Sequence, residues 1–261
     1  MSSNEAPAPA TMQGTAFASL SSKELAEIQQ IGNLSNKIAL ITGASSGLGR
    51  AMSQAYAAAG AFIVSADLTP NPPKAPILEK QMQTSGRDYE VPTVDLVNKQ
   101  YPSSDGRPRM AFVECNVTKA ASVEAAVAFA VKTYGRLDIM VNNAGVTAQD
   151  TSNSSRNTRT HEMSEKFYDI GFDVNVRGVW LGIKYATAQM LKQEPHSSGD
   201  RGWIINLCSI MGVVGLSGAA VYCATKGKES NRGETLADHV QVLCCSLHEV
   251  VLSNMPKTAS T

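Results

Sequence analysis

Short apolar runs alternate along the chain with longer segments in which small and apolar residues recur at helical spacing. A strand, a helix of roughly 10 to 15 residues and another strand form the repeating unit of a parallel sheet with right-handed crossovers. The pattern therefore predicts an α/β fold, a doubly wound parallel sheet in three αβα layers. The predicted strands are 37–41, 62–66, 110–115, 139–142 and 203–207, and the predicted helices are 48–59, 120–134 and most of 160–193.

The chain also divides into segments of different composition. Residues 1–30 are rich in Ala, Ser and Pro and are expected to form a disordered leader with a short helix at 22–30. Residues 31–226 carry the strands and helices of one predicted domain. Within it, 69–109 holds most of the prolines and is long for a connection, so we expect a surface insertion or a mobile flap there. Residues 227–261 form an atypical tail.

A glycine-rich turn, TGASSGLG, joins the first predicted strand to the first predicted helix. It places Gly43, Gly47 and Gly49 where the backbone turns sharply and approaches a ligand closely, beside the free N–H groups of a helix N-terminus. A turn of this kind after a strand is typical of a pyrophosphate site, although its spacing G-x-x-x-G-x-G differs from the commoner G-x-G-x-x-G. We therefore expect a dinucleotide to bind here.

Asp67 ends the second predicted strand, twenty residues after Gly47. A carboxylate at this position accepts hydrogen bonds from ribose hydroxyls and repels a 2′-phosphate. Neither Ser46 nor Leu68 adds positive charge, which favours NAD over NADP, and the nearby cation Arg50 keeps NADP as the alternative. The other interpretation of Asp67 is an ordinary loop carboxylate at a strand end.

Tyr222 and Lys226 lie four residues apart in a helical segment, and Tyr222 follows Ser209 by thirteen residues. An ammonium one turn away favours the ionised form of a phenol, which is otherwise a poor base at neutral pH. Tyr222 is therefore the expected acid and base at a reacting oxygen, and Ser209 is expected to stabilise charge on that oxygen. Each of these residues alone could have a purely structural role. Their joint spacing after the glycine turn favours a catalytic role over a structural one.

Several motifs in this order resemble the short-chain dehydrogenase/reductase family in its single-domain form, over about 37–226. TGASSGLG resembles the cofactor turn of the family, and NNAG at 142–145 resembles its fourth-strand motif. The resemblance implies a Rossmann-like NAD(P)-binding catalytic domain, in which Lys226 also holds the nicotinamide ribose and Asn175 holds a water that links the lysine to solvent. The implied catalytic residues are Asn175, Ser209, Tyr222 and Lys226. The implied cofactor-binding residues are Gly43, Ser45, Ser46, Gly47, Leu48, Gly49, Asp67, Asn116, Val117, Asn143, Ala144, Gly145, Tyr222 and Lys226.

Three of these positions carry further expectations. Asn116 and Val117 stand where the family has an Asp-Val pair, whose aspartate accepts a bond from the adenine amine. An amide oxygen also accepts hydrogen bonds, so a weaker contact is expected at Asn116. Asn143 and Gly145 are expected to be architectural, tying neighbouring strands together and letting the cofactor approach.

The sequence thus predicts an NAD(P)-dependent oxidoreductase that interconverts a secondary alcohol and a ketone by hydride transfer, with NAD preferred. A small neutral molecule is the expected partner, because 23 basic and 23 acidic residues give no electrostatic reason to expect nucleic acid or an anionic membrane. The alternative is a truncated, catalytically weak or inactive nucleotide-binding remnant.

Cysteine and histidine usage changes this picture little. Five cysteines without framework spacing indicate reduced thiols, and four histidines without zinc spacing give no reason to expect a metal. No stretch is apolar for long enough to span a bilayer, and the first twenty residues lack an export signal. We therefore expect a cytoplasmic protein.

The sixth strand, the Pro-Gly turn and the last strand of the family are not recognisable in the tail, so the C-terminal part is expected to be missing or replaced after Lys226. This would leave 203–207 as a sheet edge and the pocket without a lid, so that turnover is weak. It would also disturb a homo-oligomer, which in the family commonly uses the helix after the lysine. An amphipathic helix is predicted in the tail from Leu236, Val240, Leu243, Leu247, Val250 and Val251.

Overall fold

The computed structural model describes residues 33–72, 90–147, 159–227, 235–236 and 240–245. The chain divides into residues 1–34 and 35–261, and all of its described helices and strands belong to the second unit. The predicted leader and the predicted helix at 22–30 lie outside the described residues.

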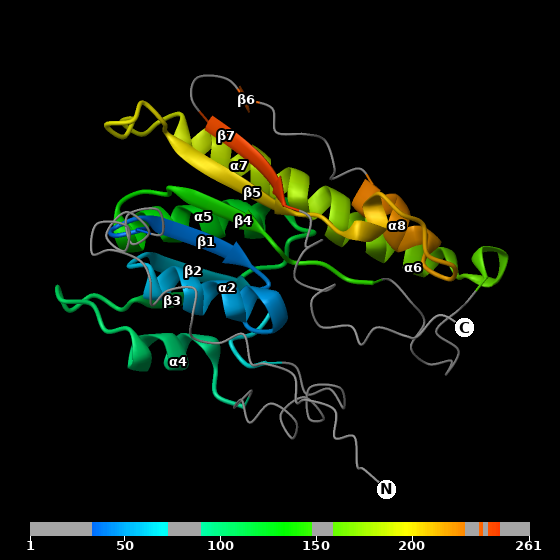
Figure 1. Ribbon diagram of the computed structural model, residues 1–261, viewed down its shortest axis with the longest axis horizontal. Coiled ribbons are helices and arrows are strands. Elements are labelled where there is room, and N and C mark those ends of the chain that lie inside the picture. Colours follow the sequence, from blue (N-terminus) through cyan, green and yellow to red (C-terminus); the bar gives the residue numbers. More distant parts are fainter. Residues whose placement is uncertain (1–32, 73–89, 148–158, 228–234, 237–239, 246–261) are drawn as a thin grey trace, which may run out of the picture. The chain divides into compact units, whose positions relative to one another are not determined.

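A seven-stranded sheet forms the middle layer of the second unit (Figure 1). Its strand order is β3-β2-β1-β4-β5-β7-β6, and every neighbouring pair is parallel except β6 with β7. The chain builds outward from β1 to β3 and then returns to β4 and β5, so the order reverses between β1 and β4. This confirms the predicted doubly wound parallel sheet. The strands are β1 Ile38–Thr42, β2 Phe62–Asp67, β3 Met110–Glu114, β4 Ile139–Asn142, β5 Gly202–Leu207, β6 Thr235–Leu236 and β7 Val240–Cys245.

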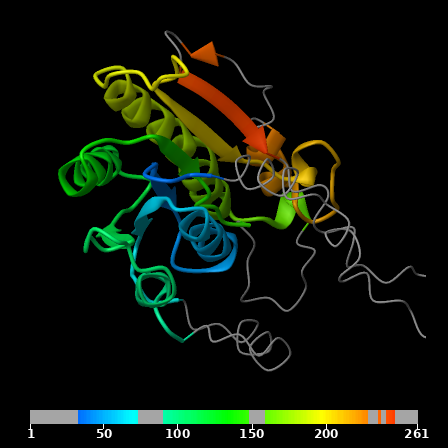
Figure 2. The ribbon, with the colours of Figure 1, turned by 60° about the vertical axis from the view of Figure 1, so that its left-hand side comes forward.

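Helices cover both faces of this sheet (Figure 2). One face packs against α2 and α4, and the other packs against α5 and α7, which also contact each other. α8 contacts α6 and the short helical turns η2 and η3. The helical elements are α2 Gly47–Ala58, α4 Thr93–Gln100, α5 Ala120–Tyr134, η1 Thr160–Glu162, α6 Glu165–Phe172, η2 Asp173–Arg177, α7 Gly178–Met190, η3 Ile210–Gly212 and α8 Ala220–Gly227.

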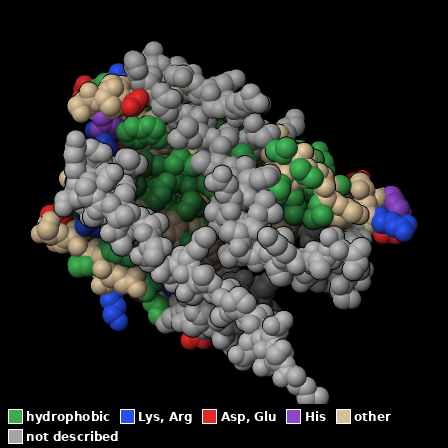
Figure 3. Space-filling view, in the orientation of Figure 1, with side chains coloured by type: hydrophobic (Ala, Val, Ile, Leu, Met, Phe, Trp, Pro, Cys, Tyr) green, Lys and Arg blue, Asp and Glu red, His purple; other side chains and the backbone are tan. Residues whose placement is uncertain are grey.

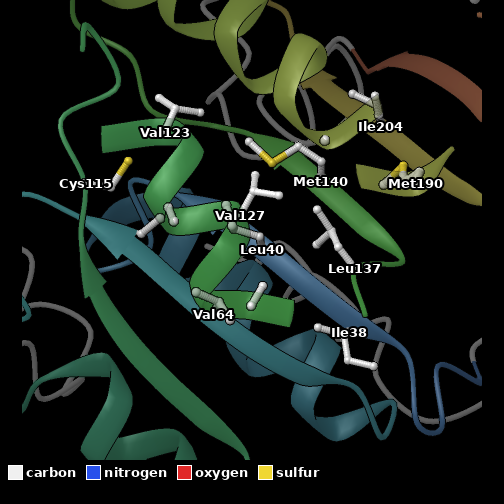
Figure 4. Packing of buried hydrophobic residues seen from close by; sticks show 14 of the residues in the cluster. Ile38, Leu40, Val64, Cys115, Val123, Val127, Leu137, Met140, Met190 and Ile204 are labelled. Carbon is white, nitrogen blue, oxygen red and sulfur yellow. The ribbon is translucent and has the colours of Figure 1, made fainter. Parts of the chain in front are cut away.

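The main hydrophobic core lies between the sheet and the pair α5 and α7 (Figure 4). Leu40 on β1, Met140 on β4 and Ile204 on β5 are completely or almost completely buried there. Strands covered on both faces are expected to be apolar at every position, and all five residues of β1 are buried. Figure 3 shows further hydrophobic side chains in the floor of a hollow on the face turned to the viewer in Figure 1.

The predicted insertion at 69–109 contains the helix α4. Thr93 and Val97 of this helix are fully buried, and α4 contacts both α2 and β3. This part of the segment therefore serves as the crossover helix between β2 and β3. Residues 73–89 lie outside the described part.

The tail differs from its prediction. Val240–Cys245 is not helical but forms β7, which pairs with β5 over six residues, from Gly202 with Val240 to Leu207 with Cys245. The expectation that β5 becomes a sheet edge is therefore wrong, and the place beside it is filled. The physical reason is the open edge of β5, because a full ladder of backbone hydrogen bonds outweighs the helical spacing of apolar residues in a short segment.

Candidate active site

A cleft of about 560 Å³ opens at the carboxyl edge of the sheet, where the strand order reverses. This edge is the usual ligand site of open α/β sheets. The cleft brings together turns that follow β1, β2, β3, β4 and β5 with two side chains from α8. Its lining includes Gly43, Ser46, Gly47, Leu48, Asp67, Asn116, Val117, Asn143, Ala144, Gly145, Ser209, Tyr222 and Lys226. Of the predicted site residues, Ser45, Gly49 and Asn175 lie behind this lining.

The glycine turn forms the middle of the cleft wall. Gly43 and Gly47 have φ angles of +68° and +52°, a conformation that side chains other than hydrogen disfavour. A Cβ on Gly49 would lie 2.1 Å from the carbonyl oxygen of Gly43 and 2.7 Å from Asn143 Nδ2, so only glycine allows this close approach. α2 begins at Gly47, and the Ser46 side chain makes no capping bond. The backbone N–H groups at this helix end thus form a cradle suited to a phosphate.

Asp67 and Arg50 take different positions. Asp67 Oδ2 accepts a bond from Ser45 N at 2.9 Å and Oδ1 accepts one from Leu68 N at 2.8 Å, which fixes the carboxylate beside the glycine turn. Arg50 is buried, and its Nη1 donates to Val91 O at 2.6 Å. Its guanidinium is thus bound to the segment before α4 and does not line the cleft.

The ends of β1 and β4 are joined by a side chain that the sequence did not single out, Thr42. Its hydroxyl accepts bonds from the N–H groups of Asn143 and Ala144, both at 3.0 Å, and donates to Val141 O. Asn143 Nδ2 donates in turn to Thr42 O at 2.8 Å and to Gly43 O at 3.2 Å. This network places Asn143 in the floor of the cleft. The available signal was a hydroxyl residue at the end of a buried strand, directly before the glycine turn.

Lys226 lies at the other end of the cleft with its side chain buried. Its Nζ donates to the backbone oxygen of Leu207, the last residue of β5, at 2.7 Å. A Cβ on Gly145 would lie 3.9 Å from the same Nζ. The ammonium is therefore fixed between the ends of β4 and β5. Half-buried Tyr222, one turn earlier in α8, also lines the cleft.

Ser209 follows β5 and lines the cleft beside these residues. Its Oγ accepts a bond from Met211 N at 3.2 Å, at the start of η3. η3 packs closely on the end of α8, because a Cβ on Gly212 would lie only 2.5 Å from Lys226 O. This packing sets the serine segment against the helix that carries the tyrosine and the lysine.

Asn175 is fully buried in η2, a π-helical turn between α6 and α7. Its Oδ1 accepts from Val146 N at 2.9 Å, and its Nδ2 donates to Val146 O at 2.8 Å and to Thr225 Oγ1 at 3.0 Å. Thr225 Oγ1 donates to Tyr222 O at 2.8 Å. Asn175 thus joins the turn after β4 to α8. π-turns inside helices occur often at functional sites, and Thr225 is a buried member of this network that the sequence did not reveal.

Asn116 and Val117 follow β3 and line the far end of the cleft. Asn116 Oδ1 accepts bonds from both Thr118 N at 3.0 Å and Thr118 Oγ1 at 2.8 Å. The amide oxygen that was expected to meet an adenine amine is therefore already used within the turn. Cys115 also lines this end, and burial raises the pKa of its thiol.

The residues that the structure describes contain no group of three or more His, Cys, Asp or Glu side chains placed to hold a metal ion. None of the helices among them is long and apolar enough to cross a membrane.

Comparison with known proteins points to one family. The family model for short chain dehydrogenase matches residues 37–105 and 97–242. (+)-Borneol dehydrogenase 2 of Salvia officinalis is 30% identical over 237 residues, which are 87% of this chain and 71% of the relative. A 3-oxoacyl-(acyl-carrier-protein) reductase, FabG of Staphylococcus aureus, is 33% identical over 190 residues, 73% of this chain and 63% of the relative. The crystal structure of a short chain dehydrogenase from Mycobacterium smegmatis has a TM-score of 0.57 at 24% identity, covering 75% of this chain and 68% of that chain.

Proposed function

Because the chain belongs to the short-chain dehydrogenase family, we propose that it interconverts a secondary alcohol and a ketone with a nicotinamide dinucleotide as the hydride carrier. One observation carries the proposal. One part of the cleft wall is the glycine cradle and the N-terminus of α2. Another part of the wall of the same cleft is formed by Tyr222, Lys226 and Ser209. The cradle fits the group, since a Cβ at Gly49 would displace the backbone of Gly43 that forms it.

The positions of the residues support the following roles. When bound, the dinucleotide supplies or takes up the hydride. Tyr222 holds the proton that leaves or joins the substrate oxygen, since Tyr222 lines the same cleft as Ser209 and Lys226. The ammonium of Lys226, one turn along the helix, lies at the same end of the cleft and binds the nicotinamide ribose, as the family resemblance implies. Ser209 stabilises charge on the reacting oxygen with its hydroxyl.

Asn175 does not line the cleft and acts through its neighbours. Its two bonds to the backbone of Val146 and its bond to Thr225 keep the turn after β4 in register with α8. We assign it a positioning role, together with the water-holding role that the family resemblance implies.

The charges near the glycine turn favour NAD over NADP. The carboxylate of Asp67 lines the cleft, and a 2′-phosphate beside it would be repelled. Arg50, the cation that kept NADP as an alternative, is bound to Val91 O and Thr93 Oγ1 and lies outside the lining. We therefore expect NADP to bind more weakly than NAD.

A second candidate is dinucleotide binding without efficient turnover. Three apolar side chains in the segment after η3 are more than half exposed, namely Val213 at 72%, Val214 at 57% and Leu216 at 51%. Exclusion of water is part of what closing loops supply in such enzymes, so a segment after η3 that leaves its apolar side chains in water would go with weaker catalysis. This observation favours weak catalysis over a complete loss of binding.

The test separates binding from chemistry. NAD and NADP affinity is measured by fluorescence, and turnover is measured by NADH absorbance with a panel of neutral secondary alcohols. Tyr222→Phe is expected to lower turnover by roughly 10² to 10⁴-fold with little change in NAD affinity. Tyr168→Phe is the matched control, since Tyr168 is half exposed on α6 and outside the cleft lining.

Each outcome decides between the candidates. Turnover that falls in the Tyr222 variant and not in the Tyr168 variant supports the oxidoreductase. NAD binding without turnover supports the second candidate. A wild-type protein that binds neither dinucleotide would overturn both.

A further inference from the structure

The amide of Asn116 has a fixed orientation in the cleft. Thr118 N is a donor, so the atom of Asn116 that faces it at 3.0 Å must be the oxygen, Oδ1. The Thr118 hydroxyl donates to the same oxygen at 2.8 Å. Neither bond uses Nδ2, which makes no hydrogen bond to any residue that the structure describes. Since Asn116 lines the cleft, its amino group is the part of the side chain left for a ligand.

The position of Asn116 in the sheet indicates which part of a dinucleotide it meets. β3 is the strand next to β2 on the side away from β1, and Asp67 on β2 pairs with Glu114 on β3. Cys115 N donates to Asp67 O at 2.8 Å, so the turn that holds Asn116 begins directly beside Asp67. If Asp67 receives the ribose, the phosphates lie on one side of that ribose, at the glycine turn after β1. The purine base is attached on the other side and then lies over the turn after β3.

We propose that Asn116 sets the base selectivity of the dinucleotide site by presenting an N–H donor to the edge of the purine. The inference rests on the proposed function, because it requires a dinucleotide in this cleft. Adenine carries a 6-amino group, which is a donor and finds no acceptor at Nδ2. Hypoxanthine carries a 6-oxo group, which is an acceptor and pairs with an N–H donor. The site therefore tolerates a 6-oxo purine far better than a site with a carboxylate at the same position.

Rotation of the amide does not restore an acceptor without cost. Turning Oδ1 toward the ligand would place Nδ2 against Thr118 N and would break the bond from that N–H, while the Thr118 hydroxyl could accept from Nδ2 instead. Two donors would then face each other, and an unsatisfied backbone N–H carries a desolvation penalty. The turn at 116–118 thus holds the donor toward the cleft.

One substitution changes the donor and leaves the turn intact. In Asn116→Asp, one carboxylate oxygen keeps the two bonds from Thr118, and the other replaces Nδ2 by an acceptor. Asn116→Ala removes both groups and serves as the intermediate case. The affinities of wild type and both variants for NAD and for nicotinamide hypoxanthine dinucleotide are measured by fluorescence titration.

The ratio of the two dissociation constants is the readout, because a change in charge or in folding acts on both ligands alike. The ratio of the hypoxanthine to the adenine dissociation constant is expected to rise from wild type to Asn116→Ala, and to be roughly tenfold or more above wild type in Asn116→Asp. Equal ratios in all three proteins would overturn the inference while leaving the proposed function in place. Failure of the wild type to bind either dinucleotide would overturn both.

Discussion

Replacement of Gly49 by alanine tests the cradle directly. The added carbon would lie 2.1 Å from Gly43 O and 2.7 Å from Asn143 Nδ2, whereas real Cβ contacts stay above 3.0 Å. The backbone of the glycine turn must therefore move by about 1 Å, and overpacking of this kind costs about 1 to 3 kcal/mol of stability. Each backbone bond to a charged phosphate that is lost is worth about 1.5 to 3 kcal/mol, so NAD affinity is expected to fall by roughly tenfold or more.

Urea unfolding and NAD titration of the folded variant measure the two effects separately. Gly135→Ala is the matched control, because Gly135 has a φ of +93° at the C-terminal end of α5, lies outside the cleft lining and has no atom within 4 Å of the added carbon. It is expected to lower stability and to leave NAD affinity unchanged. Wild-type NAD affinity in Gly49→Ala, or an equal loss in both variants, would refute the cradle.

Two further predictions concern stability. Burial raises the pKa of the Tyr134 phenol to about 12, so the folded state keeps a proton that the unfolded state releases near pH 10. The difference in stability between wild type and Tyr134→Phe should therefore shrink as pH rises from about 10 to 12, and a difference in urea midpoints that does not change with pH would contradict this. Asp138 is fully buried and accepts bonds from Ile38 N, Arg136 Nε and His196 Nε2. Asp138→Leu should therefore lower the free energy of unfolding by about 3 to 5 kcal/mol, and a loss below about 1 kcal/mol in urea unfolding would argue against a stabilising role of this network.

Much of the fold was predictable from local patterns. β1 to β5 and α5 were predicted at or within one residue of their observed bounds, because parallel strands buried on both faces form unbroken apolar runs. The strand β7 was not predictable, since Val240–Cys245 fits both a helical and an extended pattern and only the open edge of β5 decides between them. The helix α4 was not predicted, because the many prolines in 69–109 indicated a surface insertion, whereas Val97 of α4 is fully buried.

The candidate site divides in a similar way. The glycine turn and the pair Tyr222 and Lys226 were visible because their spacing along the chain is itself the signal. The burial of Arg50 and the use of the Asn116 oxygen by Thr118 depend on contacts between side chains and loops, which no spacing encodes. The structure brings the predicted residues to one cleft, except for Ser45, Gly49 and Asn175, which lie behind its lining. Their roles in binding and catalysis stay predictions, as does a homo-oligomer.

The link between Asn175 and residue 146 has a consequence for how the pocket varies. Both bonds between the Asn175 amide and residue 146 involve the main chain of Val146, so they would form equally well with any residue other than proline there. That side chain is 36% exposed and lines the cleft. Substitutions at position 146 would therefore change the shape of the pocket wall and leave the bonds to Asn175 in place. They offer a route to new substrate preferences.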